Sequence, residues 1–194
     1  QIAELANVTL RGQFRTFDPS DARIILLDGA SQVLPPFGER LGRKTKRALE
    51  RAGVEVHLGA IVTDVDADSV TWRTADGETV TVPSAAKVWA AGVRGSELGA
   101  MLAEQTGVGL DRAGRVEVDE HLAIPGHPEI TVIGDLAAVP GVPGMAQGAI
   151  QGARYVARRI ADAAAGRPVD PAPFRYVDKG SMATIAKLAA VVKI

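Results

Sequence analysis

One stretch of the chain constrains the fold more than any other. It covers residues 129–151 and reads EITVIGDLAAVPGVPGMAQGAIQ. The order of residue types predicts a short apolar strand over 130–133, an exit at Gly134-Asp135, a loop rich in glycine and proline, and a helix that begins near Met145. Strand–loop–helix units of this kind are frequent in α/β folds, so the pattern by itself indicates the fold class and not a function.

The residues at the turn of this unit are of types that suit a polar ligand. Gly134 lets a ligand approach the backbone closely. Asp135 offers acceptor oxygens for hydroxyl groups. The helix start offers free N–H groups and the positive end of the helix dipole, which attract an anion. An ordinary buried packing unit explains the same residues about equally well.

The predicted helix carries two glutamines near its start. Gln147 and Gln151 are four residues apart and therefore share one face of the helix. Two amides on one face suit a ligand that carries carbonyl groups. Two solvated surface glutamines are the alternative, and the spacing alone favours it.

Four motifs resemble one family, the type II NADH:quinone oxidoreductases, which are single-subunit respiratory dehydrogenases that pump no protons. AQGAIQ at 146–151 resembles the family's AQxAxQ quinone-site motif, and TVIGD at 131–135 its second flavin motif. KVWAAGV at 87–93 resembles the crossover between the two domains, and PFRYVDKGSMATIAK at 173–187 a late segment of the flavin domain. The motifs follow in the family's order over essentially the whole chain, and they are most similar to actinobacterial members.

The resemblance implies an α/β fold, namely part of a two-dinucleotide-binding-domain, Rossmann-like FAD/NAD(P)-binding flavoprotein with a small antiparallel β meander. Residues 1–93 would be the C-terminal part of the NADH-binding domain, and residues 94–194 the C-terminal part of the FAD-binding domain. No G-x-G-x-x-G sequence occurs in the chain, and both chain ends interrupt a regular pattern. We therefore expect a fragment that lacks the N-terminal FAD motif, the NADH glycine loop and the C-terminal membrane anchor.

The resemblance also implies an activity, which is the transfer of electrons from NADH through FAD to a membrane quinone. Glutamine does not titrate in the useful pH range, so we expect the two glutamines to position the quinone while protons come from water. The implied contacts with FAD are Gly134, Asp135, Ala146, Gln147 and Lys179; those with NADH are Asp28, Ala91 and Gly92; those with the quinone are Gln147 and Gln151.

Asp28 ends an apolar strand, RIILLD at residues 23–28. In dinucleotide-binding folds an acid at this place accepts the hydroxyls of the adenosine ribose and favours NADH over NADPH. An aspartate in a plain Asp28-Gly29 turn is the alternative, and without the resemblance it would be the better interpretation.

Hydrophobic periodicity predicts the remaining elements. We expect helices over 2–10, 39–52 and 145–165, and strands over 24–27, 54–58, 61–65, 69–74, 78–82, 86–91, 116–118, 130–133, 174–178 and 181–185. Ala75-Asp76-Gly77 predicts the hairpin turn within the meander. The basic face of the helix over 39–52 is most simply a solvated face.

Composition excludes several classes of protein. A net charge of −1 offers no electrostatic basis for binding nucleic acid. The absence of cysteine excludes disulfides and thiolate metal sites, and it counts against sulfide:quinone reductases and disulfide reductases. The three histidines show no metal-ligand spacing, so we expect no metal. A mean hydropathy of +0.09 predicts a soluble chain.

Two further expectations concern the surroundings of the protein. The resemblance implies a peripheral protein at the cytoplasmic face of the cell membrane, attached through a segment after Ile194, and possible assembly of the parent as a homodimer. A different class of protein stays open beside the enzyme: a catalytically silent binding or interaction module that keeps half of each nucleotide fold.

Overall fold

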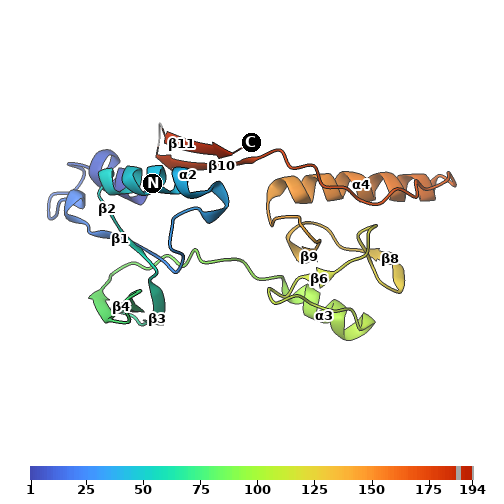
Figure 1. Ribbon diagram of the computed structural model, residues 1–194, viewed down its shortest axis with the longest axis horizontal. Coiled ribbons are helices and arrows are strands. Elements are labelled where there is room, and N and C mark those ends of the chain that lie inside the picture. The colour runs from blue at the N-terminus through green and yellow to red at the C-terminus, as the bar shows by residue number, and fades with distance from the viewer. Residues whose placement is uncertain (187–188, 194) are drawn as a thin grey trace. The chain divides into compact units, whose positions relative to one another are not determined.

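The computed structural model describes residues 1–186 and 189–193, which form two compact units (Figure 1). The first unit contains Gln1–Trp89 and the segment from Gly180 onward, and the second contains Ala90–Lys179. The units differ from the division expected at residue 93, since 90–93 group with the second unit and the C-terminal strands with the first. The assignment of the two parts of the chain to an NADH domain and an FAD domain stays a prediction.

The first unit is built on a β–α–β element. Strand β1 (Ile24–Asp28) pairs in parallel with β2 (Val54–Leu58), and helix α2 (Glu39–Arg51) connects them. Gly42 and Thr45, one turn apart, are the buried residues of α2. The bounds of all three elements agree with the predicted ones to within a residue, and β1 is half-buried rather than fully buried.

A three-stranded antiparallel meander follows. It consists of β3 (Ile61–Val65), β4 (Ser69–Arg73) and β5 (Thr79–Pro83). Trp72 on β4 is 2% exposed and lies opposite Val62 of β3 and Val80 of β5. Gly77 in the turn between β4 and β5 has a φ of +87°, a conformation that glycine adopts without strain. The predicted meander and its hairpin turn are confirmed.

The rest of the first unit consists of short elements and a hairpin. Helix α1 (Ile2–Glu4) continues into a π-helical turn at Leu5–Thr9, and 3₁₀ turns occupy Pro19–Asp21 and Pro35–Phe37. The hairpin pairs β10 (Ser181–Ala186) with β11 (Ala189–Lys193). Its end contacts the 3₁₀ turn, since Nζ of Lys193 donates a 2.6 Å hydrogen bond to the carbonyl of Pro36.

The second unit combines two helices with two small strand pairs. Its elements are α3 (Glu97–Thr106), β6 (Val116–Glu117), β7 (Ala123–Ile124), β8 (His127–Thr131), β9 (Ala137–Ala138) and α4 (Ala146–Ala164). Strands β6 and β9 are parallel, and β7 and β8 are antiparallel. The core of this unit is formed by the buried side chains of Val116, Ile124, Val132 and Ala137.

Helix α4 is the longest element, and it packs through glycine. Gly148, Gly152 and Val156 are its buried residues, spaced every four positions along one face. A Cβ at Gly148 would lie 2.8 Å from a methyl carbon of Val142, and one at Gly152 would lie 3.6 Å from a methyl carbon of Ile133. Gly148 therefore lets the loop before the helix lie directly against it, whereas Gly152 has room for a Cβ.

Three strand predictions need correction. Residues 86–91 form no strand, because none of the described residues pairs with them, and Val88 and Trp89 are largely exposed. Residues 174–178 form no strand either, because the backbone of Val177 bonds to a side chain of α4 instead of to a neighbouring strand. The strand predicted over 130–133 lies earlier, at His127–Thr131.

No helix within residues 1–186 and 189–193 combines the length and the apolar character needed to cross a membrane.

Candidate flavin and quinone site

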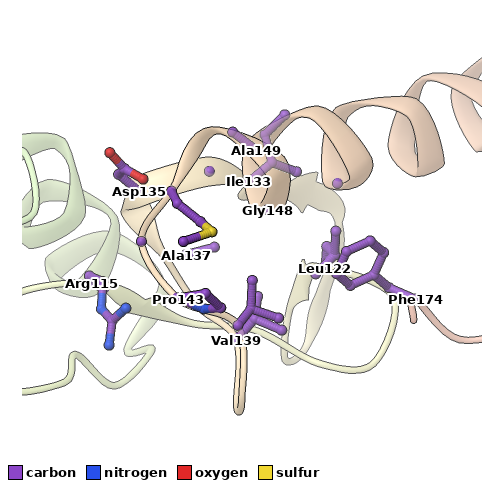
Figure 2. A pocket seen from close by; sticks show the side chains of 15 residues that line it. Arg115, Leu122, Ile133, Asp135, Ala137, Val139, Pro143, Gly148, Ala149 and Phe174 are labelled. Carbon is purple, nitrogen blue, oxygen red and sulfur yellow. The ribbon is translucent and has the colours of Figure 1, made fainter. Parts of the chain in front are cut away.

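A small recess lies where the Gly134-Asp135 turn meets the start of α4. Its cavity volume is about 20 Å³, room for about one water molecule. Figure 2 shows Asp135 and Arg115 on one side of the recess, and Leu122 with Phe174 on the opposite side. The lining also includes Ile133, Gly134, Met145, Gly148 and Ala149.

Gly134 is held in a left-handed conformation, with a φ of +68°. A Cβ at this position would lie 3.4 Å from the Cβ of Ala149 on α4. The turn therefore depends on glycine mainly through its backbone conformation, since that separation is an ordinary contact. This geometry brings the main chain of the turn close to the first residues of the helix.

Asp135 follows in the same 3₁₀ turn, Gly134–Leu136, and is exposed. Among the described residues no hydrogen bond or ion pair engages its carboxylate. One of its oxygens lies 3.8 Å from the place that a Cβ of Gly144 would occupy. Its acceptor oxygens thus stand beside the glycine-rich loop, available to hydroxyl groups of a ligand.

The start of α4 offers unpaired backbone donors. Met145 precedes the helix in an extended conformation, and no side chain caps the helix. The N–H of Gly148 donates to the carbonyl of Met145 at 3.0 Å. The N–H groups of Ala146 and Gln147 find no acceptor in the described part of the chain, as expected for the first turn of an uncapped helix. This end of the helix carries the positive end of its dipole.

The two glutamines differ in what their amides do. Gln147 is half-buried, and within residues 1–186 and 189–193 its side chain makes no hydrogen bond. Gln151 uses both ends of its amide on one residue: Nε2 donates to the carbonyl of Val177 at 3.0 Å, and Oε1 accepts from the N–H of Val177 at 2.9 Å. Gln147 is therefore the one whose amide is available to a ligand.

Arg115 was not predicted as a site residue. It lines the recess, and its guanidinium donates to Asp111 at 2.7 Å. The pKa of Asp111 lies below its ordinary value, first because the backbone N–H of Arg115 donates to the carboxylate and then because the Arg115 side chain does. The DRAGR sequence at 111–115 is the signal that could have found this pair, since aspartate commonly binds the N–H groups of its own turn.

Phe174 and its neighbours were also missed. Phe174 lines the recess, and its N–H donates to the carbonyl of Glu120 at 2.8 Å. Tyr155 of α4 contacts its ring edge-on, with centroids 5.6 Å apart, and the Tyr155 hydroxyl lies 2.7 Å from Nδ1 of His121. Burial raises the pKa of Tyr155. These partners are far apart in sequence, and no local pattern indicates them.

The remaining predicted residues lie elsewhere. Asp28 belongs to the first unit, where one carboxylate oxygen accepts from the N–H of Ala30 at 2.9 Å. Ala91 and Gly92 belong to the second unit, are exposed, and form a turn in which Gly92 has a φ of +85°. Lys179 is exposed at the end of the second unit. Of the predicted residues, the recess is thus lined by Gly134 and Asp135 alone. Helix α4 lines it through Gly148, Ala149 and Gly152, and not through Ala146, Gln147 or Gln151.

A family model of pyridine nucleotide-disulphide oxidoreductases matches residues 7–153, which is most of the chain. The chain belongs to this family.

Relatives within the family are named type II NADH:quinone oxidoreductases. Two from Mycobacterium tuberculosis are 56% and 52% identical over the whole chain. One from Staphylococcus aureus is 32% identical over 87% of the chain. The chain spans 42% of the length of each mycobacterial relative. The resemblance that the motifs indicated is therefore confirmed.

Solved structures confirm the fold. NDH2 from Plasmodium falciparum in complex with NADH superposes with a TM-score of 0.80 at 17% identity, over 98% of this chain and 54% of that one. A sulfide:quinone oxidoreductase from Aquifex aeolicus superposes with a TM-score of 0.61 at 18% identity, over 75% of this chain and 36% of that one. The predicted α/β, Rossmann-like FAD/NAD(P)-binding fold is confirmed by these likenesses together with the family match.

Proposed function

We propose that this chain is part of a flavin-dependent enzyme that oxidises NADH and reduces a membrane quinone. When bound, FAD would accept a hydride from NADH and pass two electrons on to the quinone. The reaction balances as NADH, one proton and a quinone giving NAD⁺ and a quinol. The relatives at 56% and 52% identity carry this activity in their names.

The observation that carries the proposal is the polar lining of the turn between Ile133 and α4. The unpaired N–H groups of Ala146 and Gln147 and the dipole of α4 favour negative charge, which reduced flavin carries near N1 and O2. Gly134 has no side chain, so a ligand can approach the backbone closely there, and the carboxylate of Asp135 can accept hydrogen bonds from the ribityl hydroxyls. These residues fit one part of an FAD site, whose remaining contacts would come from elsewhere, Lys179 among them.

On the NADH side we assign Asp28. Its carboxylate stands at the carboxyl end of β1, in a β–α–β unit, where ligands bind in such folds. One oxygen caps Ala30, and the other has no partner among the described residues. It would accept a ribose hydroxyl of NADH and repel the 2′-phosphate of NADPH. The exposed Ala91-Gly92 turn, which carries no bulky side chain, is assigned to the nicotinamide side.

On the quinone side we assign Gln147 and Gln151. Both lie on the first turns of α4, beside the unpaired N–H groups that the flavin would use. The amide of Gln147 can donate to or accept from quinone oxygens, whereas that of Gln151 is engaged by Val177 beside the same site. Neither amide can supply protons, so the two protons of the quinol come from water and from the hydride equivalent of NADH. Attachment to the cytoplasmic face of the membrane through a segment after Ile194, and a homodimer, are proposed on the resemblance alone.

Steady-state turnover of the complete protein tests this proposal. NADH oxidation, followed at 340 nm, is expected only when FAD and a soluble quinone are both present, with one NADH consumed per quinone reduced. NADPH is expected to be a poor substrate. If the protein is a silent binding module, no FAD-dependent turnover is expected with any quinone. That result would refute the proposed enzyme activity.

A further inference from the structure

A segment at the end of the second unit runs back along α4. We call residues 167–178 the strap. It leaves the end of the helix and returns beside it, as Figure 1 shows in the orange-red part of the chain. Side-chain hydrogen bonds join it to the helix. Arg167 of the strap donates to the carboxylate of Asp162. From the helix, Arg159 donates to the carbonyl of Asp170, Tyr155 to that of Ala172 and Gln151 to that of Val177.

The residues of α4 that hold the strap form one row. Gln151, Tyr155 and Arg159 follow each other at intervals of four, so their side chains project from one face. Four helical residues rise about 6 Å, and two extended residues span about the same length. Arg159 and Tyr155 reach carbonyls two residues apart, those of Asp170 and Ala172. The helix and the strap are thus in register over this stretch.

Gln151 makes the contact that most resembles a strand partner. Its amide donates to the carbonyl and accepts from the N–H of the same residue, Val177, at 3.0 and 2.9 Å. A neighbouring strand makes the same two bonds in an antiparallel pair. Both groups of the amide are therefore engaged, whereas the amide of Gln147 has no partner in the described part of the chain.

The strap brings two aromatic side chains to the start of α4. Phe174 lines the recess. The hydroxyl of Tyr176 lies 3.6 Å from Sδ of Met145, the residue that immediately precedes the helix. Val177 is the next residue along, so its two hydrogen bonds fix the backbone directly beside Tyr176.

We propose that Gln151 is a positioning residue: it acts on the quinone site through the strap, whose backbone it fixes at Val177, and Gln147 is the glutamine that contacts the quinone. This inference rests on the proposed function for its kinetic part only. The two glutamines thus have different roles, since Gln147 contacts the quinone and Gln151 positions the strap. The strap, not the amide of Gln151, would then form the wall of the quinone site next to the helix start.

The first test is hydrogen exchange of the Val177 amide in the complete protein, which needs no activity. Gln151→Met keeps the length of the side chain but removes both hydrogen bonds, and it should speed exchange of this amide by about three- to tenfold. Gln151→Glu keeps an acceptor for the Val177 N–H but places a carboxylate oxygen against the Val177 carbonyl, which repels it, so it should also speed this exchange. Gln147→Met is the matched control on the same helix face and should leave it unchanged.

Exchange of Val177 that is the same in wild type and Gln151→Met would overturn the inference, because the amide would then not hold the strap. This result can be read even if the protein shows no quinone reductase activity, so a failure of the proposed function stays distinguishable.

The second test is a double-mutant cycle on the KM for quinone, with Tyr155→Phe as the partner. Tyr155 holds the strap at Ala172 and is given no ligand. If both residues act through the strap, Tyr155→Phe should raise this KM by itself, and the double variant should show less than the product of the two single effects. A Tyr155→Phe variant with the KM of the wild type, beside a Gln151→Met variant with a raised KM, would assign Gln151 to direct contact and overturn the inference.

Discussion

Gly134 is the residue at which a left-handed backbone conformation and the proposed flavin site coincide. Its φ of +68° is a conformation that a residue with a Cβ adopts at a cost of about 1–2 kcal/mol. We predict that Gly134→Ala lowers the free energy of unfolding of the complete protein by about this amount, measured by urea denaturation, and that it also weakens FAD binding.

Gly141 provides the control for that variant. Its φ is +74°, and a Cβ there would meet nothing within 4 Å. Gly141→Ala should therefore lose a similar stability but bind FAD as the wild type does. Equal loss of FAD affinity in the two variants would mean that general destabilisation, and not the turn at Gly134, weakens the flavin site.

Asp28 gives a prediction on nucleotide choice. Removing its charge in Asp28→Asn weakens a charge-assisted hydrogen bond to the ribose, which corresponds to about a tenfold rise in the KM for NADH. The KM for NADPH should fall or stay constant, because the repulsion of the 2′-phosphate is gone. Asp21→Asn, an exposed aspartate in the same unit, is the control. Unchanged kinetics in Asp28→Asn would leave Asp28 as a turn residue that caps Ala30.

Asp111 gives a prediction on pH. Hydrogen bonds from the backbone N–H and then the side chain of Arg115 lower the pKa of Asp111 below its ordinary value of 3.8. A lowered pKa in the folded state stabilises that state above the ordinary value, and this stabilisation disappears as the pH falls through the lowered one. Asp111→Asn should thus be less stable than the wild type at pH 7, and the difference should shrink below about pH 3.8. A difference that is independent of pH would contradict this account.

Single residues differ in how far the sequence predicts them. Gly134, Asp135 and the first residues of α4 could be predicted as one site because they are neighbours in the chain. The partner of Gln151 could not, because Val177 lies 26 residues away and a side-chain bond to backbone leaves no periodicity in the sequence. The same holds for His121 and Tyr155, which are 34 residues apart.

At the scale of elements, α4 depends on the side chains that join it to the strap. The hydroxyl of Tyr155 donates to the carbonyl of Ala172 at 2.7 Å and lies 2.7 Å from Nδ1 of His121. We predict that Tyr155→Phe lowers the free energy of unfolding by about 1 kcal/mol, because two partners lose a hydrogen bond while the ring keeps its contact with Phe174.

Arg158→Ala is the comparison for this element, since Arg158 is an exposed residue of the same helix and no described residue contacts its guanidinium by a hydrogen bond or ion pair. When both variants are measured by urea denaturation, Arg158→Ala should change the free energy of unfolding by no more than about 0.5 kcal/mol. If Tyr155→Phe were as mild as Arg158→Ala, the contact of the strap with α4 would contribute nothing measurable at this point.

Elements with a strong period and clear end signals could be predicted closely. Helix α2 and the strands of the meander lie within a residue or two of their expected bounds, helped by Gly53 after the helix and Gly77 in the turn. Residues 86–91 and 174–178 are apolar enough for strands but have no strand beside them among the described residues. Apolar composition alone does not make a strand, because a strand needs a hydrogen-bonded neighbour from elsewhere in the chain. Here Val88, Trp89 and Val177 are in fact largely exposed.

At the scale of the whole molecule, fold class and family could be predicted because several weak motifs occur in one fixed order. Each motif alone fits many α/β proteins, but together they specify one family, and the relatives agree. The grouping of the C-terminal strands with the first unit could not be predicted, because it depends on contacts such as that of Lys193 with Pro36, far apart in sequence.

Whether the protein passes electrons from NADH through FAD to a quinone can be read from the flavin absorbance spectrum of the complete protein, recorded without oxygen after incubation with FAD. We predict a bound flavin whose band near 450 nm bleaches when NADH is added and returns when a quinone follows. Gln147→Met should bleach as the wild type does and recover more slowly at limiting quinone. A protein that binds no FAD, or whose flavin is not bleached by NADH, would contradict the proposed electron transfer and leave a silent module on the same fold.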